Sequence, residues 1–450
     1  MNRRDLLKLT AGGLGVTVAG MVDTDAQELP RESSAREVVW NRRVQVRWDA
    51  DVVVIGGGIA GVCAAAAAAR SGSRVLLVER FGITGGMLTV GGVSNFCGQL
   101  SGQGEVFDEI LSDLRLWKAI GQERPSVFHY EVLAVVLQEL LLRRKVHILL
   151  HTRFVDALER DGHITEVLVA GKSGLEAVRA KQFIDCSGDG DVARVLGYST
   201  FKGRPEDGLQ LPMSMMYFVR HVDDPSVGPR LPEGWFDPVV REEDLPMTSV
   251  WPDGPGGNAI KIKIPMFDAT DTEGITAAEI KGRRRMWEVM HYHQGVAGKP
   301  WLLDHCSPSI GIREGTRIAG EYVLTVDDLR AGRSFDDGVA RGTFYLDGHK
   351  PDDEKRTYIL PEDALEVPPY QIPLRALVAK DGKNLMMAGR CFSSDQLALS
   401  SARVSTTGAM MGQAAGIASA LSVEKGCDVR DLDPREVRRI VEERGAVLAV

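Results

Sequence analysis

Residues 51–80 read DVVVIGGGIAGVCAAAAAARSGSRVLLVER, and this stretch decides the fold. Asp51 to Ile55 is an apolar, β-branched run typical of a strand buried in a parallel sheet. An alanine-rich segment follows, which is a strong helix former, and Gly72 ends it before the second strand at 74–78. The segment therefore predicts a strand, a glycine turn, a helix and a second strand in succession.

Three glycines in this segment have the G-x-G-x-x-G spacing of dinucleotide-binding turns. Gly56 permits a tight turn, Gly58 lets the backbone approach a pyrophosphate, and Gly61 lets the helix pack closely. The N-terminus of the helix, which contains Ala60, then faces the phosphate charge. Glu79 lies eighteen positions after Gly61, where a carboxylate can accept hydrogen bonds from a ribose. The segment predicts a bound dinucleotide, and a glycine turn without a ligand is the alternative.

A second glycine loop follows directly. Residues 81–87 read FGITGGM, and Gly85 and Gly86 offer another place where the backbone can approach a cofactor. A flavin site would use such a loop, whereas a nicotinamide domain would usually continue into another helix. The loop therefore favours FAD, and an ordinary glycine loop is the alternative.

Four further blocks carry a family resemblance, in the family's order: FIDCSGDGDVARVLG (183–197), IGIREGTRIAGEYVLT (310–325), YQIPLRAL (370–377) and NLMMAGRCFSSDQLALSSARVSTTGAMMGQAAGIASAL (384–421). With the segment above, they resemble the FAD-dependent oxidoreductases built on a glutathione-reductase type FAD-binding domain. The chain departs slightly at Cys186 and Ser187, where alanine and threonine are commoner. The resemblance implies a Rossmann-like α/β fold with an inserted α+β substrate domain.

The resemblance also implies site residues. For the small residues of the C-terminal block, close packing between helices is the alternative to contact with the cofactor. Arg313, Arg403 and Tyr370 are the candidate catalytic residues, although the arginines, like Arg317, could form structural ion pairs with Glu314, Glu321 or Asp395. His305 is a possible base. The implied cofactor contacts beyond the glycines and Glu79 are Arg80, Met87, Val155 (adenine), Ser187, Gly188, Asp189, Gly389, Arg390, Gly412, Gln413 and Ala414.

The motifs divide the chain. We expect an FAD-binding domain at 49–200 and 370–450, split by a substrate domain at 201–369. Within these parts, 127–144 has helical periodicity, 146–158 reads as strands, 213–223 and 259–271 alternate like half-buried strands, and 276–294 reads as a helix.

The N-terminus resembles an export signal. Arg3 and Arg4 precede an apolar stretch at 9–22 and small residues around 24–26, the order of a twin-arginine signal peptide. The stretch is too short for a stable membrane span. We expect a signal at 1–26, a lead-in at 27–48, export of the folded protein by the twin-arginine machinery, and a periplasmic or secreted location. A disordered tail with a chance arginine pair is the alternative.

Composition and residue spacing argue against a nucleic-acid-binding protein and a metalloprotein. The net charge of −8 indicates no nucleic-acid partner, and six cysteines show no C-x-x-C spacing. His291 and His293 do not share a helix face, so no metal site is expected. Cys97 and Cys391 lie beside predicted cofactor loops, where a covalent flavin link is conceivable, although buried cysteine is the simpler interpretation.

The leading hypothesis is hydride transfer between a small organic substrate and flavin N5, with electrons passed to oxygen or an exported carrier. A fumarate-reductase-like direction stays open. The alternatives are a non-redox dinucleotide-binding protein, a flavin-bearing isomerase or hydratase, and an NAD-dependent dehydrogenase. A second G-x-G-x-x-G with its own strand and acid is absent from the sequence, which weakens the NAD(P)H-dependent interpretation.

Overall fold

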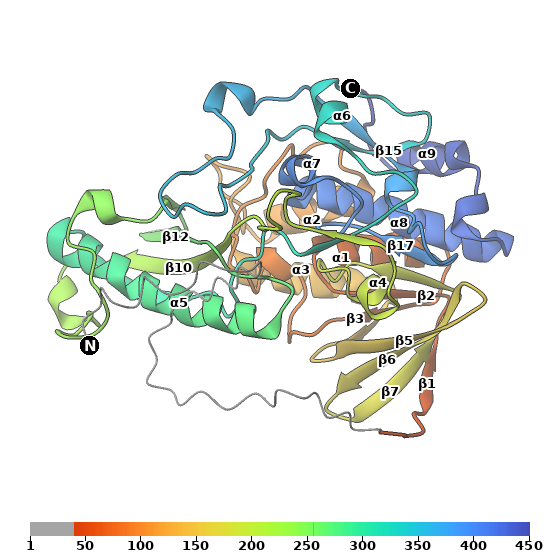
Figure 1. Ribbon diagram of the computed structural model, residues 1–450, viewed down its shortest axis with the longest axis horizontal. Helices are drawn as coiled ribbons and strands as arrows, with labels where there is room; N and C mark the ends of the chain where they lie inside the picture. The colour runs from red at the N-terminus through yellow and green to blue at the C-terminus, as the bar shows by residue number, and fades with distance from the viewer. Residues whose placement is uncertain (1–39, 255) are drawn as a thin grey trace, which may run out of the picture. The chain divides into compact units, whose positions relative to one another are not determined.

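A five-stranded parallel sheet, in the order β17-β8-β2-β3-β4, organises the fold in the computed structural model, which describes residues 40–254 and 256–450 (Figure 1). β2 and β3 are fully buried apolar strands, as the sequence predicts. β17 joins the sheet from the C-terminal block, so distant parts of the chain complete one sheet. The strands are β2 (Val52–Ile55), β3 (Val75–Val78), β4 (His147–Leu149), β8 (Gln182–Asp185) and β17 (Leu385–Met387).

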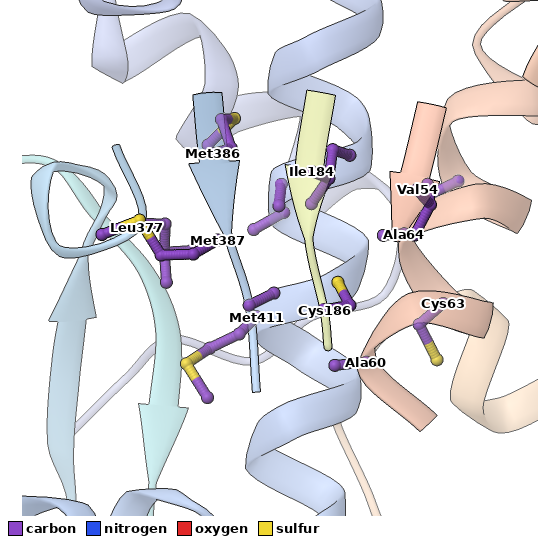
Figure 2. Close-up of a cluster of buried hydrophobic side chains, with 14 of the residues drawn as sticks. Val54, Ala60, Cys63, Ala64, Ile184, Cys186, Leu377, Met386, Met387 and Met411 are labelled. Atoms are coloured by element: carbon purple, nitrogen blue, oxygen red, sulfur yellow. The ribbon is translucent and has the colours of Figure 1, made fainter. Parts of the chain in front are cut away.

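Two helices pack closely against each other beside this sheet. Figure 2 shows Ala60 and Ala64 of α1 and Met411 of α8 near the strand residues Val54 and Ile184. The close approach needs glycine, because a Cβ on residue 412 would lie 2.1 Å from the carbonyl oxygen of Ala60. The helices of this part are α1 (Ile59–Arg70), α2 (Glu105–Leu116), α3 (Tyr130–Arg143), α8 (Ser405–Lys425) and α9 (Pro434–Glu443).

A second sheet has the order β1-β7-β6-β5. β5, β6 and β7 pair antiparallel, and β1 pairs parallel with β7. The expectation of strands at 146–158 is confirmed by β4 and β5, and the helix expected at 127–144 is α3. The strands are β1 (Val46–Asp49), β5 (Arg153–Arg160), β6 (His163–Gly171) and β7 (Gly174–Arg179).

A third, antiparallel sheet in the order β11-β12-β10-β13 lies in the part predicted as the insert, and α5 packs on it (Figure 1). The helix expected at 276–294 is α5, which starts four residues earlier, at Thr272, and gives way to a π-helical turn at 292–296. The half-buried alternation expected for β10 is wrong, since Met213 to Val219 are buried on both faces. One face lies under α5, and Met216 and Phe218 on the other face pack with Tyr130 and Trp251. The elements are β10 (Met213–His221), β11 (Thr248–Pro252), β12 (Gly257–Ile264), β13 (Trp301–Cys306) and α5 (Thr272–His291).

Short elements complete the described chain. The predicted division into domains at 200 and 370 stays a prediction, and the expected signal at 1–26 and most of the lead-in lie outside the described residues. Within residues 40–254 and 256–450, no helix has the length and hydropathy that a bilayer crossing needs. The remaining elements are α4 (Asp191–Val195), β9 (Thr200–Lys202), β14 (Thr316–Ile318), α6 (Val326–Arg330), β15 (Gly338–Gly342), β16 (Tyr370–Pro373) and α7 (Gln396–Ala402).

Candidate active site

A cavity opens at the carboxyl ends of the parallel strands, and β10, β12 and the start of α8 complete its wall. This is where open α/β sheets bind their ligands. The predicted site residues in its wall are Gly56, Gly58, Ala60, Glu79, Arg80, Gly85, Gly86, Met87, Ser187, Gly188, Arg313, Gly389, Arg390 and Arg403. Those outside the wall are Gly61, Val155, Asp189, Tyr370, Gly412, Gln413 and Ala414.

The glycine turn after β2 forms a cradle at the start of α1. Gly56 has a φ of 100°, and its Cβ would lie 2.4 Å from the carbonyl oxygen of Cys186. Gly58 is the N-cap of α1, and a Cβ there would meet nothing within 4 Å. Gly61 serves packing, because its Cβ would lie 1.9 Å from the Gly56 oxygen. The turn leaves an open space in front of the helix N-terminus, which suits a phosphate group.

The second glycine loop is held against the first. The Gly85 N–H donates to the Gly57 carbonyl at 2.7 Å, and Gly86, with a φ of 57°, follows. Both loops therefore reach the same part of the cavity, as a cofactor that uses both requires.

Glu79 directly follows β3 and lies beside this cradle, with 4% of its surface exposed. Its carboxylate accepts hydrogen bonds from the N–H groups of Gly57 and Phe81, each at 2.7 Å. Burial raises the pKa of Glu79, and these hydrogen bonds oppose the increase. A carboxylate has about four acceptor positions, so Glu79 can also accept hydrogen bonds from a ribose.

The start of β5 contributes a different residue from the one expected. Phe154 lines the cavity and is buried, whereas Val155 is 45% exposed and points away. Successive side chains of a strand point to opposite faces, so only one of these two neighbours can face the cavity.

The block at 183–197 is fixed by a buried acid and an arginine. Asp185, which the sequence analysis did not single out, accepts hydrogen bonds from the Ser187 hydroxyl and from the Val192 N–H, and burial raises its pKa to about 6. Asp189 lies behind the wall and pairs with Arg390 at 2.8 Å. Arg390 also donates to the Gly188 carbonyl at 2.9 Å and so ties the C-terminal block to this loop.

α8 presents its N-terminus to the cavity. Val404, Ser405 and Gly408 line the wall. Gly412, Gln413 and Ala414 lie further along the helix, where Gly412 packs on α1 and the Gln413 side chain accepts a hydrogen bond from the Val106 N–H at 3.1 Å. These contacts of Gly412 and Gln413 favour the alternative of close helix packing.

Of the three candidate catalytic residues, Arg313 and Arg403 line the cavity and Tyr370 does not. Arg313 is 8% exposed and donates to the Pro212 carbonyl at 2.8 Å and to the Ser214 hydroxyl at 2.6 Å. Arg403 pairs with Asp347 at 2.8 Å. Tyr370 is fully buried away from the cavity, with its hydroxyl 2.7 Å from that of Ser401.

Only Arg317, among the arginines considered, forms an ion pair with one of the expected acids in the described chain. Arg317, which does not line the cavity, lies 3.4 Å from Glu314, and both are buried. Arg313 makes no ion pair within residues 40–254 and 256–450, and the partner of Arg403 is Asp347 rather than one of the acids expected.

His305 also lies outside the wall. Its Nε2 is 2.5 Å from the Tyr130 hydroxyl and its Nδ1 is 2.9 Å from the Asp304 carboxylate. Among the residues described, no three His, Cys, Asp or Glu side chains gather as a metal site would require. Cys97 lines the cavity and Cys391 does not, and burial raises the pKa of both thiols.

Sequence reasoning did not single out several residues of the wall, among them Ser214, Met216, Lys261 and Asp347. Burial, with the charge of Arg313, lowers the pKa of Lys261 to about 8. Burial opposes ionisation of Asp347, but a hydrogen bond from His349 and the charge of Arg403 hold its pKa well below the usual range. The only sequence signal for Lys261 is the alternation AIKIKI at 259–264.

The fold and the glycine cradle define a Rossmann-like, nucleotide-binding α/β protein. A family model described as FAD dependent oxidoreductase matches residues 51–441, so the chain belongs to the FAD-dependent oxidoreductases. FAD is the cofactor, which decides against the nicotinamide alternative. The residues fit it, because the open space at Gly58, the N-terminus of α1 and the carboxylate of Glu79 match a pyrophosphate and a ribose.

One solved structure supports the fold. The chain is similar to a geranylgeranyl bacteriochlorophyll reductase-like protein from Thermoplasma acidophilum, with a TM-score of 0.50 and 13% identity over 89% of this chain and 84% of that one. It is also similar to the OxyS anhydrotetracycline hydroxylase from Streptomyces rimosus, with a TM-score of 0.43 and 15% identity over 88% and 65% of the two chains. The first likeness shows the fold alone. No curated protein matches the sequence significantly.

Proposed function

We propose that this FAD-dependent oxidoreductase takes a hydride from a small organic substrate and passes the electrons to oxygen or to an external carrier. One observation carries the proposal: a single cavity extends from Gly56 and Gly58, at the cofactor cradle, to Ser214 and Met216 of the insert sheet. Bound FAD supplies the hydride acceptor, so the protein has to hold the substrate and stabilise charge.

The residues of the wall suit these two tasks. The N-terminus of α8, at Ser405, offers a positive dipole end to negative charge that develops in the cavity. Arg313 is fixed by two hydrogen bonds to neutral groups, so its charge is available to a ligand. The buried Met216 side chain reduces the access of water on the insert side.

The proposal extends to the type of domain. The block at 183–197 and the loop at 81–87 support a glutathione-reductase type FAD domain, and the antiparallel sheet with α5 supports an inserted α+β substrate domain. The insert would then determine the substrate, since its strands β10 and β12 reach the cavity.

The test is anaerobic reduction of the purified holoenzyme, followed by flavin absorbance at about 450 nm. A substrate of the enzyme should bleach this band, and oxygen or an added carrier should restore it. If a compound is turned over with neither bleaching nor net electron transfer, the protein is a flavin-bearing isomerase or hydratase and the proposal fails.

We also propose that the protein is exported folded by the twin-arginine machinery. The support is the order of Arg3, Arg4, the apolar stretch at 9–22 and the small residues near 26. A reporter fused after residue 48 should leave the cytoplasm, and the paired substitutions Arg3→Lys and Arg4→Lys should retain it. Export of the paired variant at the original rate would contradict the route.

A further inference from the structure

β10 and β12 turn one face to the cavity, and this face carries lysines. Lys261 of β12 lies directly opposite Met216 of β10, and both line the cavity. Ile260 and Ile262, on either side of Lys261, belong to the hydrophobic cluster with Met286 of α5. Because side chains alternate along a strand, Lys261 points away from α5 and into the cavity wall.

Lys261 meets other cations there. Its ammonium group makes no hydrogen bond or ion pair within residues 40–254 and 256–450, and Arg313 bonds only to the neutral groups of Pro212 and Ser214. Of Lys261, Arg313 and Arg403, only Arg403 forms an ion pair within the described residues, and its partner is Asp347.

Three cationic side chains therefore share one carboxylate at this end of the cavity. Within residues 40–254 and 256–450, neither Lys261 nor Arg313 forms an ion pair with another acid. His349 beside Asp347 is a neutral imidazole whose pKa burial lowers to about 3. Lys263, next along the same face, is buried outside the cavity wall and donates to the Arg356 carbonyl at 2.6 Å. Arg313 is buried and Lys261 is half-buried, so their unpaired charges are costly, and an anionic ligand in the cavity would offset this cost.

We infer that Lys261 and Arg313 bind a carboxylate group of the substrate, so that the substrates are small organic acids. This inference rests on the proposed function. The FAD phosphates are the other possible source of negative charge, but the cradle at Gly58 and the N-terminus of α1 already serve them. A charge-assisted hydrogen bond from each cation to the carboxylate would fix the orientation of the substrate.

The experiment titrates the FAD-loaded enzyme with three acids and their uncharged amides: acetate and acetamide, succinate and succinamide, benzoate and benzamide. Binding is measured by the change in flavin absorbance. At least one acid should bind about tenfold more tightly than its amide, as expected for hydrogen bonds to charged groups. Lys261→Met should remove most of this preference, and Lys261→Arg should restore it.

The matched control is Lys281→Met, which removes an exposed lysine of α5 outside the cavity wall. It should keep both the preference for acids and the affinity for FAD. If acids and amides bind alike to the wild-type enzyme, or if no acid binds, the inference is overturned without any reliance on a variant.

Two further results separate the possible failures. If Lys261→Met loses affinity for FAD itself, the cation belongs to the cofactor and the inference is overturned. An enzyme that binds acids as expected but is never reduced by any of them contradicts the proposed function alone.

Discussion

Arg403 donates a hydrogen bond of 2.8 Å to the carboxylate of Asp347 in the wall of the cavity, where both side chains are less than one-fifth exposed. Asp347→Asn would leave the Arg403 charge without its partner. We expect the free energy of unfolding to fall by about 3 kcal/mol, as when one partner of a buried pair is removed. Chemical denaturation of the two proteins measures this difference.

The control for this prediction is Asp352→Asn. Asp352 is exposed and pairs with Lys350 at 2.6 Å, and surface pairs contribute less than about 1 kcal/mol. If the free energy of unfolding fell equally in the two variants, burial would not explain the effect at Asp347.

Two glycines of the phosphate turn should respond differently to alanine. At Gly58 the backbone is extended and a Cβ has free space, so Gly58→Ala should fold normally. Its methyl group would occupy the space in front of the helix N-terminus, and the Kd for FAD should rise at least about tenfold. At Gly61 the Cβ would lie 1.9 Å from the Gly56 oxygen, so Gly61→Ala should lose about 3 kcal/mol of stability.

Thermal unfolding of the apoprotein and fluorescence titration with FAD distinguish the two effects. A Gly58→Ala protein that binds FAD as tightly as the wild type would mean that the pyrophosphate does not approach this residue.

Tyr370→Phe should affect stability rather than the reaction. The sequence made Tyr370 a catalytic candidate, yet its hydroxyl is buried against Ser401 and the residue does not line the cavity. Loss of this hydrogen bond should cost about 1 kcal/mol. A rate of flavin reduction that falls tenfold or more in this variant would show that Tyr370 acts on the reaction.

The cofactor half of the site could be predicted because its determinants are local in sequence. The turn at Gly56 and Gly58 and the acid at Glu79 lie within one strand-turn-helix-strand unit, and their spacing fixes their geometry. The side chain of Val155 points away from the cavity, since a shift of one residue along a strand reverses the face, and Phe154 lines the cavity instead.

The substrate half could not be predicted, because its residues meet only in the folded chain. Lys261 and Asp347 are brought together by the pairing of β10 with β12 and by the return of the chain before β16. The alternation around Lys261 is typical of a strand with one face in water, and the sequence cannot say that this face borders a cavity.

The affinity for carboxylates should fall as the pH rises through about 8. Burial and the charge of Arg313 lower the pKa of Lys261 to about 8, so its ammonium charge is present below this pH and lost above it. The other groups that act on Lys261 are Asp347, Cys97 and Arg403. The pKa of Asp347 is held well below its usual range, burial raises the pKa of the Cys97 thiol, and arginine keeps its charge.

The Kd of the acid that binds best in the titrations should therefore rise about tenfold between pH 7 and pH 9.5, whereas that of its amide should not change. Flavin absorbance titrations across this range measure both constants. Lys261→Arg provides the control, because arginine does not deprotonate in this range and the Kd should stay nearly constant. An equal pH dependence in the wild type and in Lys261→Arg would assign the titration to another group and remove Lys261 from the binding of the acid.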